Sequence, residues 1–397
     1  MLQKYRIAFA DPRARAFSFA GFIARMPISM VGIGVLMYVE SARGNYTLAG
    51  SVSAIGAISA AIGGPLTSRL TDRVGQHRVL PWQILIAVTT AIALIFTIPS
   101  NLPAVWIFVF AIISGFFAPS IGALVRARWT ALLVSGPVLI TAFSVESMID
   151  EIIFVIGPSI AALTSVNIHP AAPQSIAAVF LIVGGTWLIS MRDTEPPINR
   201  NQVKHGKPVV FKNGLLWMVF IHFLAGIFFG SIETTMIAFS NFAGVPIAAG
   251  LLLALWSIGS LIGGIFYGAN EFSMPLPNQL VLISLVLIPP AVLLPFINGL
   301  GLMAVLSILA GFGIAPLLIA AASIAQQRAG DGRTTEAIAS MYSGIAVGFA
   351  FAAASSGWLI DNHGTNWAFS VGTGAALAIT LGTLAAQNGL LKPLSTR

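Results

Sequence analysis

Long apolar runs follow one another along almost the whole chain, and short polar stretches separate them. A transmembrane helix needs roughly 20 mostly apolar residues, whereas a strand of a membrane barrel shows about ten residues that alternate between apolar and polar. The runs here are long and do not alternate, so the pattern predicts an all-α integral membrane protein with twelve transmembrane helices. The predicted spans are Ala16–Val39, Thr47–Leu70, Val79–Ile98, Ala104–Val125, Val138–Thr164, Gln174–Met191, Leu215–Phe239, Ile247–Gly268, Gln279–Ile297, Leu300–Ala325, Thr335–Ile360 and Trp367–Gln387.

The composition agrees with a chain that lipid surrounds. Hydrophobic residues make up 57% of the 397 residues and charged residues only 8%, whereas about 25% charged is usual in soluble proteins. Cysteine is absent, which excludes disulfides, thiolate metal sites and cysteine nucleophiles. We expect no metal and no cofactor.

An internal repeat divides the chain into two related halves. The stretch AGSVSAIGAISAAIGG, which begins at Ala49, returns as AGLLLALWSIGSLIGG from Ala249, and Ala118-Pro119 in the fourth span is echoed by Ala315-Pro316 in the tenth. Repeats of this kind are typical of membrane transporters. We expect a six-helix bundle over 1–195, a charged and proline-containing linker over 196–212, and a second six-helix bundle over 213–397.

The basic residues indicate how the chain lies in the membrane. With twelve spans, every Lys and Arg except Arg25 and Arg43 falls on the side of the N-terminus. Short cytoplasmic loops concentrate such residues, so we expect both termini in the cytoplasm and a multi-pass protein of the plasma (inner) membrane. This orientation accounts for the formal net charge of +7, and we expect lipid, and no nucleic acid, around the chain.

A charged turn between the second and third spans carries a family resemblance. Residues 68–80, SRLTDRVGQHRVL, resemble the signature GxLaDRxGrkxxL of the major facilitator superfamily. Ser68 replaces its first glycine, and Gln76 and His77 replace its later basic pair. The matching positions are Leu70, Asp72, Arg73, Gly75 and Leu80. The resemblance implies that superfamily's fold, two pseudo-symmetric halves of six helices each, and we expect a monomer.

The resemblance also implies a role for the turn. Asp72, Arg73 and Gly75 would belong to a cytoplasmic gate, in which the Asp72 carboxylate forms charge-assisted bonds only when the cytoplasmic ends of the two halves meet. The alternative is that arginines of this turn, Arg69 and Arg78 above all, only orient the helices in the membrane.

The fifth span carries a second, partial match. Residues 153–162, IFVIGPSIAA, are similar to the superfamily's antiporter signature gxxxGPxxGG. Gly157 and Pro158 match, whereas Ile153, Ala161 and Ala162 replace glycines. The match favours export, and the alternative is close helix packing through small residues.

Several ionisable residues lie within the predicted spans, where each costs at least about 2.5–3.5 kcal/mol to insert. At 1.5 Å per residue, Arg25 and Glu146 lie about 13 and about 12 Å into their spans. If the first and fifth spans are neighbours, as the resemblance implies, Arg25 can pair with Glu146 or Asp150. At least one acid then remains for proton coupling, and Asp150 is the first candidate. A purely structural ion pair is the alternative. The embedded residues are Arg25, Glu146, Asp150, Glu151, His222 and Glu233.

The seventh span carries two of these residues on one face. His222 and Glu233 are three helical turns apart, on a stripe that also holds Gly226 and Phe229. Glu233 could bind a proton or a cationic substrate, and His222 could titrate near neutrality or serve only as a hydrogen-bonded packing residue.

These features predict a secondary transporter that works by alternating access. The expected partners are a small-molecule substrate and protons, and the leading hypothesis is proton-coupled export of a small hydrophobic or amphipathic compound. Uptake of a small metabolite, proton-coupled or facilitative, is the alternative. The chain contains neither GxxxxGK[ST] nor HExxH, so an ATP-driven pump and a zinc protease are disfavoured, and we do not expect an enzyme.

Overall fold

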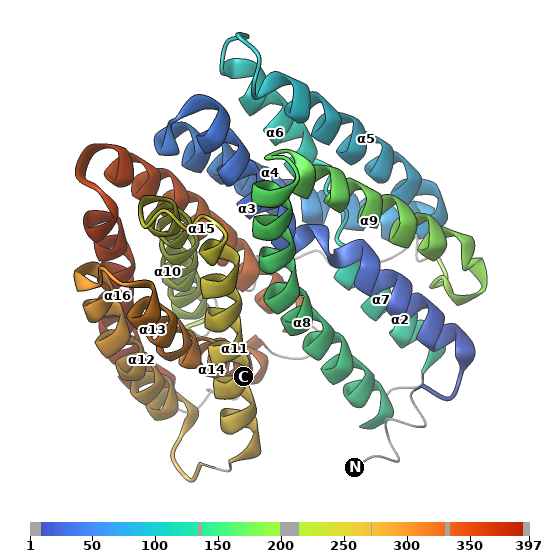
Figure 1. The fold of residues 1–397 in the computed structure, drawn as a ribbon. Helices are drawn as coiled ribbons and strands as arrows, with labels where there is room; N and C mark the ends of the chain where they lie inside the picture. Colours follow the sequence, from blue (N-terminus) through green and yellow to red (C-terminus); the bar gives the residue numbers. More distant parts are fainter. Residues whose placement is uncertain (1–8, 134–136, 199–213, 271, 330–333, 392–397) are drawn as a thin grey trace. The chain divides into compact units, whose positions relative to one another are not determined.

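The computed structural model describes residues 9–133, 137–198, 214–270, 272–329 and 334–391, and helices make up nearly all of them (Figure 1). Within these ranges, twelve helices or helix pairs are long and apolar enough to cross a membrane. The predicted all-α class and the predicted number of spans are confirmed.

The first six spans are built from eight α-helices and followed by a short 3-10 turn. The first span is a pair of helices that meet at Met26 and Pro27, where the proline removes a backbone donor. The elements are α2 (Pro12–Arg25), α3 (Pro27–Arg43), α4 (Tyr46–Val74), α5 (Gln76–Thr97), α6 (Val105–Phe116), α7 (Ile121–Leu132), α8 (Pro137–Asn167), α9 (Ala172–Ser190) and η1 (Arg192–Thr194).

Contacts group the chain into two units, of which the first holds Met1–Arg43 and Ser59–Lys204. In this unit α2 packs against α7, α8 and α9, and α3 packs against α8 and α9. Phe17 and Trp129 lie in its buried core, with their rings 4.9 Å apart in an edge-to-face arrangement. The first span is therefore packed against α7, α8 and α9.

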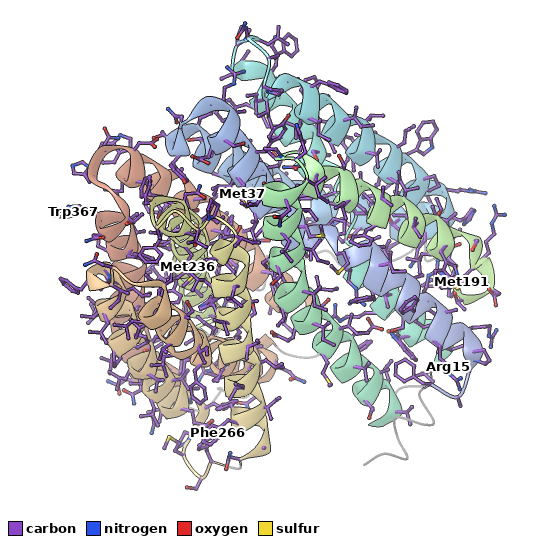
Figure 2. All side chains as sticks on the ribbon, in the orientation of Figure 1. Arg15, Met37, Met191, Met236, Phe266 and Trp367 are labelled. Carbon is purple, nitrogen blue, oxygen red and sulfur yellow. The ribbon has the colours of Figure 1, made fainter. Side chains whose placement is uncertain are left out.

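The second unit holds Gly44–Ile58 and His205–Arg397. Its central helix is α10, which packs against α11, α14, α15 and α16. Met236 of α10, labelled in Figure 2, lies 3.9 Å from the hydroxyl of Ser307 on α13. The elements are α10 (Leu215–Phe242), α11 (Ala248–Ala269), α12 (Leu276–Leu293), η3 (Leu294–Phe296), α13 (Leu300–Phe312), α14 (Ile314–Ala329), α15 (Thr334–His363) and α16 (Thr365–Leu391).

The predicted linker between the halves, 196–212, lies almost entirely outside the described residues. The division of the chain at that point, into bundles over 1–195 and 213–397, stays a prediction. The contacts add one feature to it, because the first part of α4 belongs to the second unit.

A carboxylate of the second unit holds the first turn of α4. Asp361, near the end of α15, accepts hydrogen bonds from the backbone N–H groups of Tyr46 at 3.0 Å and Thr47 at 2.6 Å. The Asn241 side chain of α10 donates to the Tyr46 hydroxyl at 2.7 Å. The first N–H groups of a helix have no partner within the helix, so a carboxylate placed there satisfies them and opposes the positive end of the helix dipole.

Both proline pairs of the repeat lie at breaks in a span. The fourth span is interrupted between α6 and α7 at Ala118-Pro119, and the tenth is interrupted between α13 and α14, next to Ala315-Pro316. An Ala-Pro pair therefore lies at or next to the helix break in both copies of the repeat.

The repeat also reproduces a close approach of two backbones. Gly63 of α4 lies against the carbonyl oxygen of Phe116 at the end of α6, and Gly263 of α11 lies in the same way against that of Phe312 at the end of α13. A Cβ at either glycine would overlap the carbonyl oxygen. The two copies of the repeat thus use one glycine position for the same helix–helix contact.

The fourth span is longer than the sequence predicts. The apolar run ends at Val125, but α7 continues to Leu132, so Arg126 and Arg128 lie inside the helix. Their interpretation as loop residues is wrong. Both guanidinium groups are bound by acceptors of neighbouring helices, which removes the cost that would otherwise end the span before them.

We expect Gly63→Ala and Gly263→Ala each to lower the unfolding temperature of the detergent-solubilised protein. The added methyl group meets backbone that can move aside only if two helices separate, and overpacking of this kind costs about 1–3 kcal/mol. Gly268→Ala is the matched control, because nothing lies within 4 Å of a Cβ at that position of α11. Equal effects at the three positions would contradict the contact.

Candidate functional site

Arg25 lies at the centre of a buried ionic cluster in the first unit. Its Nη1 donates to Oδ1 of Asp150 at 2.8 Å, and its Nη2 donates to Oε2 of Glu146. Its Nε donates to the carbonyl oxygen of Gly21 at 3.0 Å. The side chain is only 4% exposed. The prediction that Arg25 pairs with an acid of the fifth span is confirmed, and both candidate acids are bound.

Glu146 is the anchor of this cluster. Its side chain is fully buried, and its Oε1 accepts hydrogen bonds from the Ser18 hydroxyl at 2.6 Å and from Trp129 Nε1 at 2.8 Å. A buried charge is tolerated only when it is paired and its remaining lone pairs are satisfied. Two helices, α2 and α7, supply those partners for one carboxylate of α8.

Asp150 is held by a second arginine. Its Oδ2 accepts a hydrogen bond from Arg126 Nη2 at 2.8 Å, so the two oxygens of this carboxylate lie on two different guanidinium groups. Arg126 and Asp150 are about one third exposed, with side-chain values of 33% and 34%. The cluster thus runs from the buried Glu146 to an open end at Arg126.

The sequence places these groups together through simple helical spacings. Ser18 and Arg25 are seven residues apart and share a face of α2, and Glu146 and Asp150 are four apart and share a face of α8. Because Pro27 ends α2 directly after Arg25, the arginine stands at the break of the first span.

The cluster holds as many arginines as carboxylates, which differs from the charge balance that the sequence predicted. With Arg126 in a loop, Arg25 alone faces Glu146 and Asp150, and Asp150 becomes the surplus acid. With Arg126 inside α7, two arginines face two carboxylates. The acid of α8 for which the described residues show no hydrogen bond or ion pair is Glu151, which is partly buried.

In the second unit, Glu233 and His222 lie on α10 but do not meet. They are about 16 Å apart along the helix axis. His222 is 3% exposed, and its Nδ1 lies 2.9 Å from the carbonyl oxygen of Met218 in its own helix. This geometry corresponds to the hydrogen-bonded packing residue that the sequence left open. Glu233 is partly buried, and among the described residues it has neither a hydrogen bond nor an ion pair.

Further polar groups near Glu233 also lack partners. The hydroxyls of Thr234 and Thr235 and the Nε1–H of Trp256 are buried, and no described residue forms a hydrogen bond with them. The Trp256 ring lies 4.9 Å from that of Phe229, which is one turn before Glu233 on α10. An unsatisfied buried polar group costs about 1–3 kcal/mol. The unpartnered groups of α10 and α11 therefore lower the stability of the folded protein.

The charged turn between α4 and α5 is built around Gly75. Its φ of +103° lies in a region that only glycine adopts readily. On the far side of the turn, His77 Nδ1 lies 2.8 Å from Glu195 Oε2, and the His77 backbone N–H donates to Glu195 Oε1 at 3.2 Å. Glu195 therefore binds the first turn of α5 and opposes the positive end of its dipole.

Arg128 binds the start of α5 and the end of α9 from within the bundle. Its side chain is 1% exposed and donates to Gln76 Oε1 at 2.8 Å, to the carbonyl oxygens of Leu188 at 2.9 Å and Met191 at 2.7 Å, and to the Thr194 hydroxyl at 2.7 Å. Met191, at the end of α9, is labelled in Figure 2. The last carbonyl groups of a helix have no partner within it, and Arg128 supplies one.

Asp72 and Arg73 lie in the last turn of α4 with exposed side chains. Neither has a hydrogen-bond or ion-pair partner among the described residues. The gate assigned to Asp72, Arg73 and Gly75 stays a prediction, because it depends on contacts between the halves.

Gly157 and Pro158 lie inside α8. A Cβ at Gly157 would overlap Ser29 of α3, whose hydroxyl donates to the carbonyl oxygen of Ile153 at 2.9 Å. Close packing of α3 on α8 therefore accounts for the glycine. An antiporter role for the pair stays a prediction.

The sequence analysis missed the residues that complete both polar clusters. One signal could have revealed two of them, because the apolar stretch Trp129–Leu133 after Arg128 allows the fourth helix to continue past both arginines. The others carry no such signal, because they are recognised only by what they contact. The missed residues are Ser18, Arg126, Arg128, Trp129 and Glu195.

Comparison with known proteins identifies the family. The family model described as Major Facilitator Superfamily matches residues 17–274, more than half of the chain, and the chain belongs to this superfamily. It is a multi-pass membrane transporter. Among curated proteins, none matches the chain in sequence.

Solved structures share the fold at low sequence identity. A mutant of the nucleoside transporter NupG superposes with a TM-score of 0.73 at 14% identity, covering 96% of this chain and 99% of that one. A POT family transporter in complex with 5-aminolevulinic acid gives 0.73 at 14%, covering 96% of each chain. The human organic anion transporter MFSD10 (TETRAN) gives 0.66 at 13%, covering 94% of this chain and 100% of that one.

We expect Arg25→Gln to destabilise the protein strongly, because it leaves Glu146 buried without a counter-charge. Breaking one side of a buried pair costs about 3–5 kcal/mol. The double variant Arg25→Gln/Glu146→Gln should recover most of the lost unfolding temperature, since no buried charge remains. Arg126→Gln, at the open end of the cluster, serves as the control and should cost less. A double variant as unstable as Arg25→Gln would show that the pair is not what holds α2 to α8.

Proposed function

We propose that this chain is a proton-coupled secondary transporter in which Glu233 takes up and releases the coupled proton. The observation that carries the proposal is the absence of a counter-charge. Glu233 is the carboxylate in the middle of α10, and the described residues of the second unit hold a single Lys or Arg, Arg328. That arginine lies near the end of α14 and donates to the Leu390 carbonyl oxygen.

The physical argument concerns the charge of a buried carboxylate. An ionised group in an apolar bundle is stable only beside a cation or a metal, and otherwise it binds a proton and becomes neutral. Alternating access exposes such a group to each side of the membrane in turn, so that it can take a proton on one side and release it on the other. The unpartnered groups Thr234, Thr235 and Trp256 offer hydrogen bonds to a ligand near the same place.

Asp150, the first candidate from the sequence, is a weaker candidate in this structure. Its carboxylate already lies on Arg25 and Arg126, so both of its oxygens are paired with a cation, whereas no described cation lies beside Glu233. The proton-coupling role therefore passes from Asp150 to Glu233.

We propose export of a small hydrophobic or amphipathic compound as the direction of transport, on the strength of the antiporter-like pair Gly157 and Pro158. Uptake by symport is the second candidate. It is favoured by the contact between Gly157 and Ser29, since this contact explains the glycine by helix packing alone. In proteoliposomes, an imposed proton gradient should drive substrate against its concentration toward the side of higher proton concentration in antiport, and away from it in symport.

We expect Glu233→Gln to abolish transport driven by a pH gradient, because a neutral amide cannot exchange a proton. Facilitated exchange of substrate across the same membranes should persist. Glu151→Gln is the control, because it removes another partly buried acid from a span. Substrates for the assay are compounds that raise the unfolding temperature of the purified protein, since a ligand of the folded state stabilises it.

A second measurement tests the proton site without a substrate. Difference infrared spectra of the purified protein should show a protonated carboxyl band that titrates with pH, is absent from Glu233→Gln and is present in Glu151→Gln. A parent spectrum identical to that of Glu233→Gln, together with gradient-driven transport by Glu233→Gln, would refute the proposal.

We also propose a monomer in the plasma membrane, and the distribution of Lys and Arg supports the proposal that both termini lie in the cytoplasm. Because the chain has no cysteine, a single introduced cysteine reports one position. We expect Asn101→Cys to react with an impermeant maleimide in intact cells and Arg192→Cys to react only after permeabilisation. The reverse pattern would contradict the topology.

A further inference from the structure

We propose that Arg25 and Arg126 form a binding site for the carboxylate of an organic anion, and that Asp150 occupies this site in the described state. The ligand class is an amphipathic monocarboxylate. The inference rests on the proposed function in one respect, namely that the ligand is the transported substrate.

The geometry of the three residues is that of a recognised carboxylate. One guanidinium donates to Oδ1 of Asp150 at 2.8 Å, and the other donates to Oδ2 at 2.8 Å. Arginine presents several donors in a fixed plane and binds carboxylates in a defined orientation. A substrate carboxylate that replaced that of Asp150 would find the same two hydrogen bonds.

The site is prepared independently of Asp150. Arg25 is also held by Glu146 and by the carbonyl oxygen of Gly21, and Glu146 in turn by Ser18 and Trp129. Arg25 therefore keeps its position and one counter-charge when Asp150 moves away. Preorganised donors of this kind lower the cost of binding, because little has to be ordered when the ligand arrives.

The site is also open at one end. Asp150 and Arg126 are 34% and 33% exposed, whereas Arg25 is 4% exposed. Phe154, one turn after Asp150 on α8, exposes 43% of its area, so an apolar body attached to the carboxylate meets an aromatic side chain. This combination favours an aromatic or aliphatic monocarboxylate over an inorganic anion.

The charged groups around Asp150 decide whether a second carboxylate can enter the site. The charged groups around Asp150 are Arg25 from α2, Arg126 from α7, and Glu146 and Glu151 on α8 itself. Among the described residues α9 has no charged side chain, and those of α3, Glu40 and Arg43, lie in its last turn, away from the cluster.

Two arginines then face three carboxylates, because Glu151 lies next to Asp150 on α8. A further carboxylate can pair with both arginines only when the Asp150 carboxylate moves away from them. The anion therefore competes with Asp150 for the same two guanidinium groups.

Benzoate is a suitable probe, and benzamide is its uncharged counterpart. We expect benzoate, measured by calorimetry and by thermal unfolding of the full chain in detergent, to bind the parent chain more tightly than benzamide, which carries no negative charge. Asp150→Asn should bind benzoate at least tenfold more tightly than the parent chain at neutral pH, because both arginines are freed. A residue with only a structural role would not produce a gain of affinity.

Matched variants separate this result from loss of folding and from failure of the proposed function. Arg126→Gln should weaken benzoate binding at least tenfold, with an unfolding temperature close to that of the parent chain, and Arg126→Lys should restore part of the affinity. Glu233→Gln should bind benzoate as the parent chain does, because its defect lies in proton exchange. Equal binding of benzoate and benzamide, or no gain in Asp150→Asn, would overturn the inference.

Discussion

The first unit depends on the neutralisation of one arginine inside a bundle that lipid surrounds. Arg25 is only 4% exposed, and the carboxylate of Glu146 supplies a buried counter-charge for it. Ser18 and Trp129 in turn satisfy the other oxygen of that carboxylate. Each of these groups compensates the desolvation cost of the group that it contacts. Because the partners come from α2, α7 and α8, the ionic cluster also decides which helices are neighbours and at what height they meet.

The two units differ in whether their embedded carboxylates have a cation as a partner. In the first, each carboxylate of the cluster has an arginine, and the polar groups form a connected network. In the second, Glu233 has no described partner and stands near hydroxyls and an indole N–H that also lack one. A satisfied network is rigid and specific, whereas an unsatisfied one gains free energy from a proton or a ligand. The difference suits a division of labour between an anion site and a proton site.

The repeat explains why two such different units share one architecture. Gly63 and Gly263 make equivalent contacts with the ends of α6 and α13. The fourth and tenth spans, to which α6 and α13 belong, are both interrupted near a proline, Pro119 and Pro316. These positions control how closely the helix backbones approach each other. Polar substitutions elsewhere on the helices do not change that approach. The charged turn at Gly75 illustrates the same freedom. In the second copy, Phe272 and Ser273 stand at the positions of Asp72 and Arg73, whereas the first copy is held by Glu195 and Arg128.

The sequence by itself determined the class of fold and the number of spans, and it placed Arg25 and Glu146 at matching depths. That the first and fifth spans are neighbours was implied by the family resemblance. Hydrophobic length, the spacing of i and i+4 positions and the depth of a residue in its span are local quantities, so they can be read along the chain. The identity of the surplus acid was decided only by the tertiary structure. It depends on Arg126, whose place inside α7 is tolerated because the next helix, α8, supplies Asp150 as its partner. The desolvation cost of a charged group depends on all of its neighbours together. A single stretch of sequence does not contain the neighbours that come from other helices.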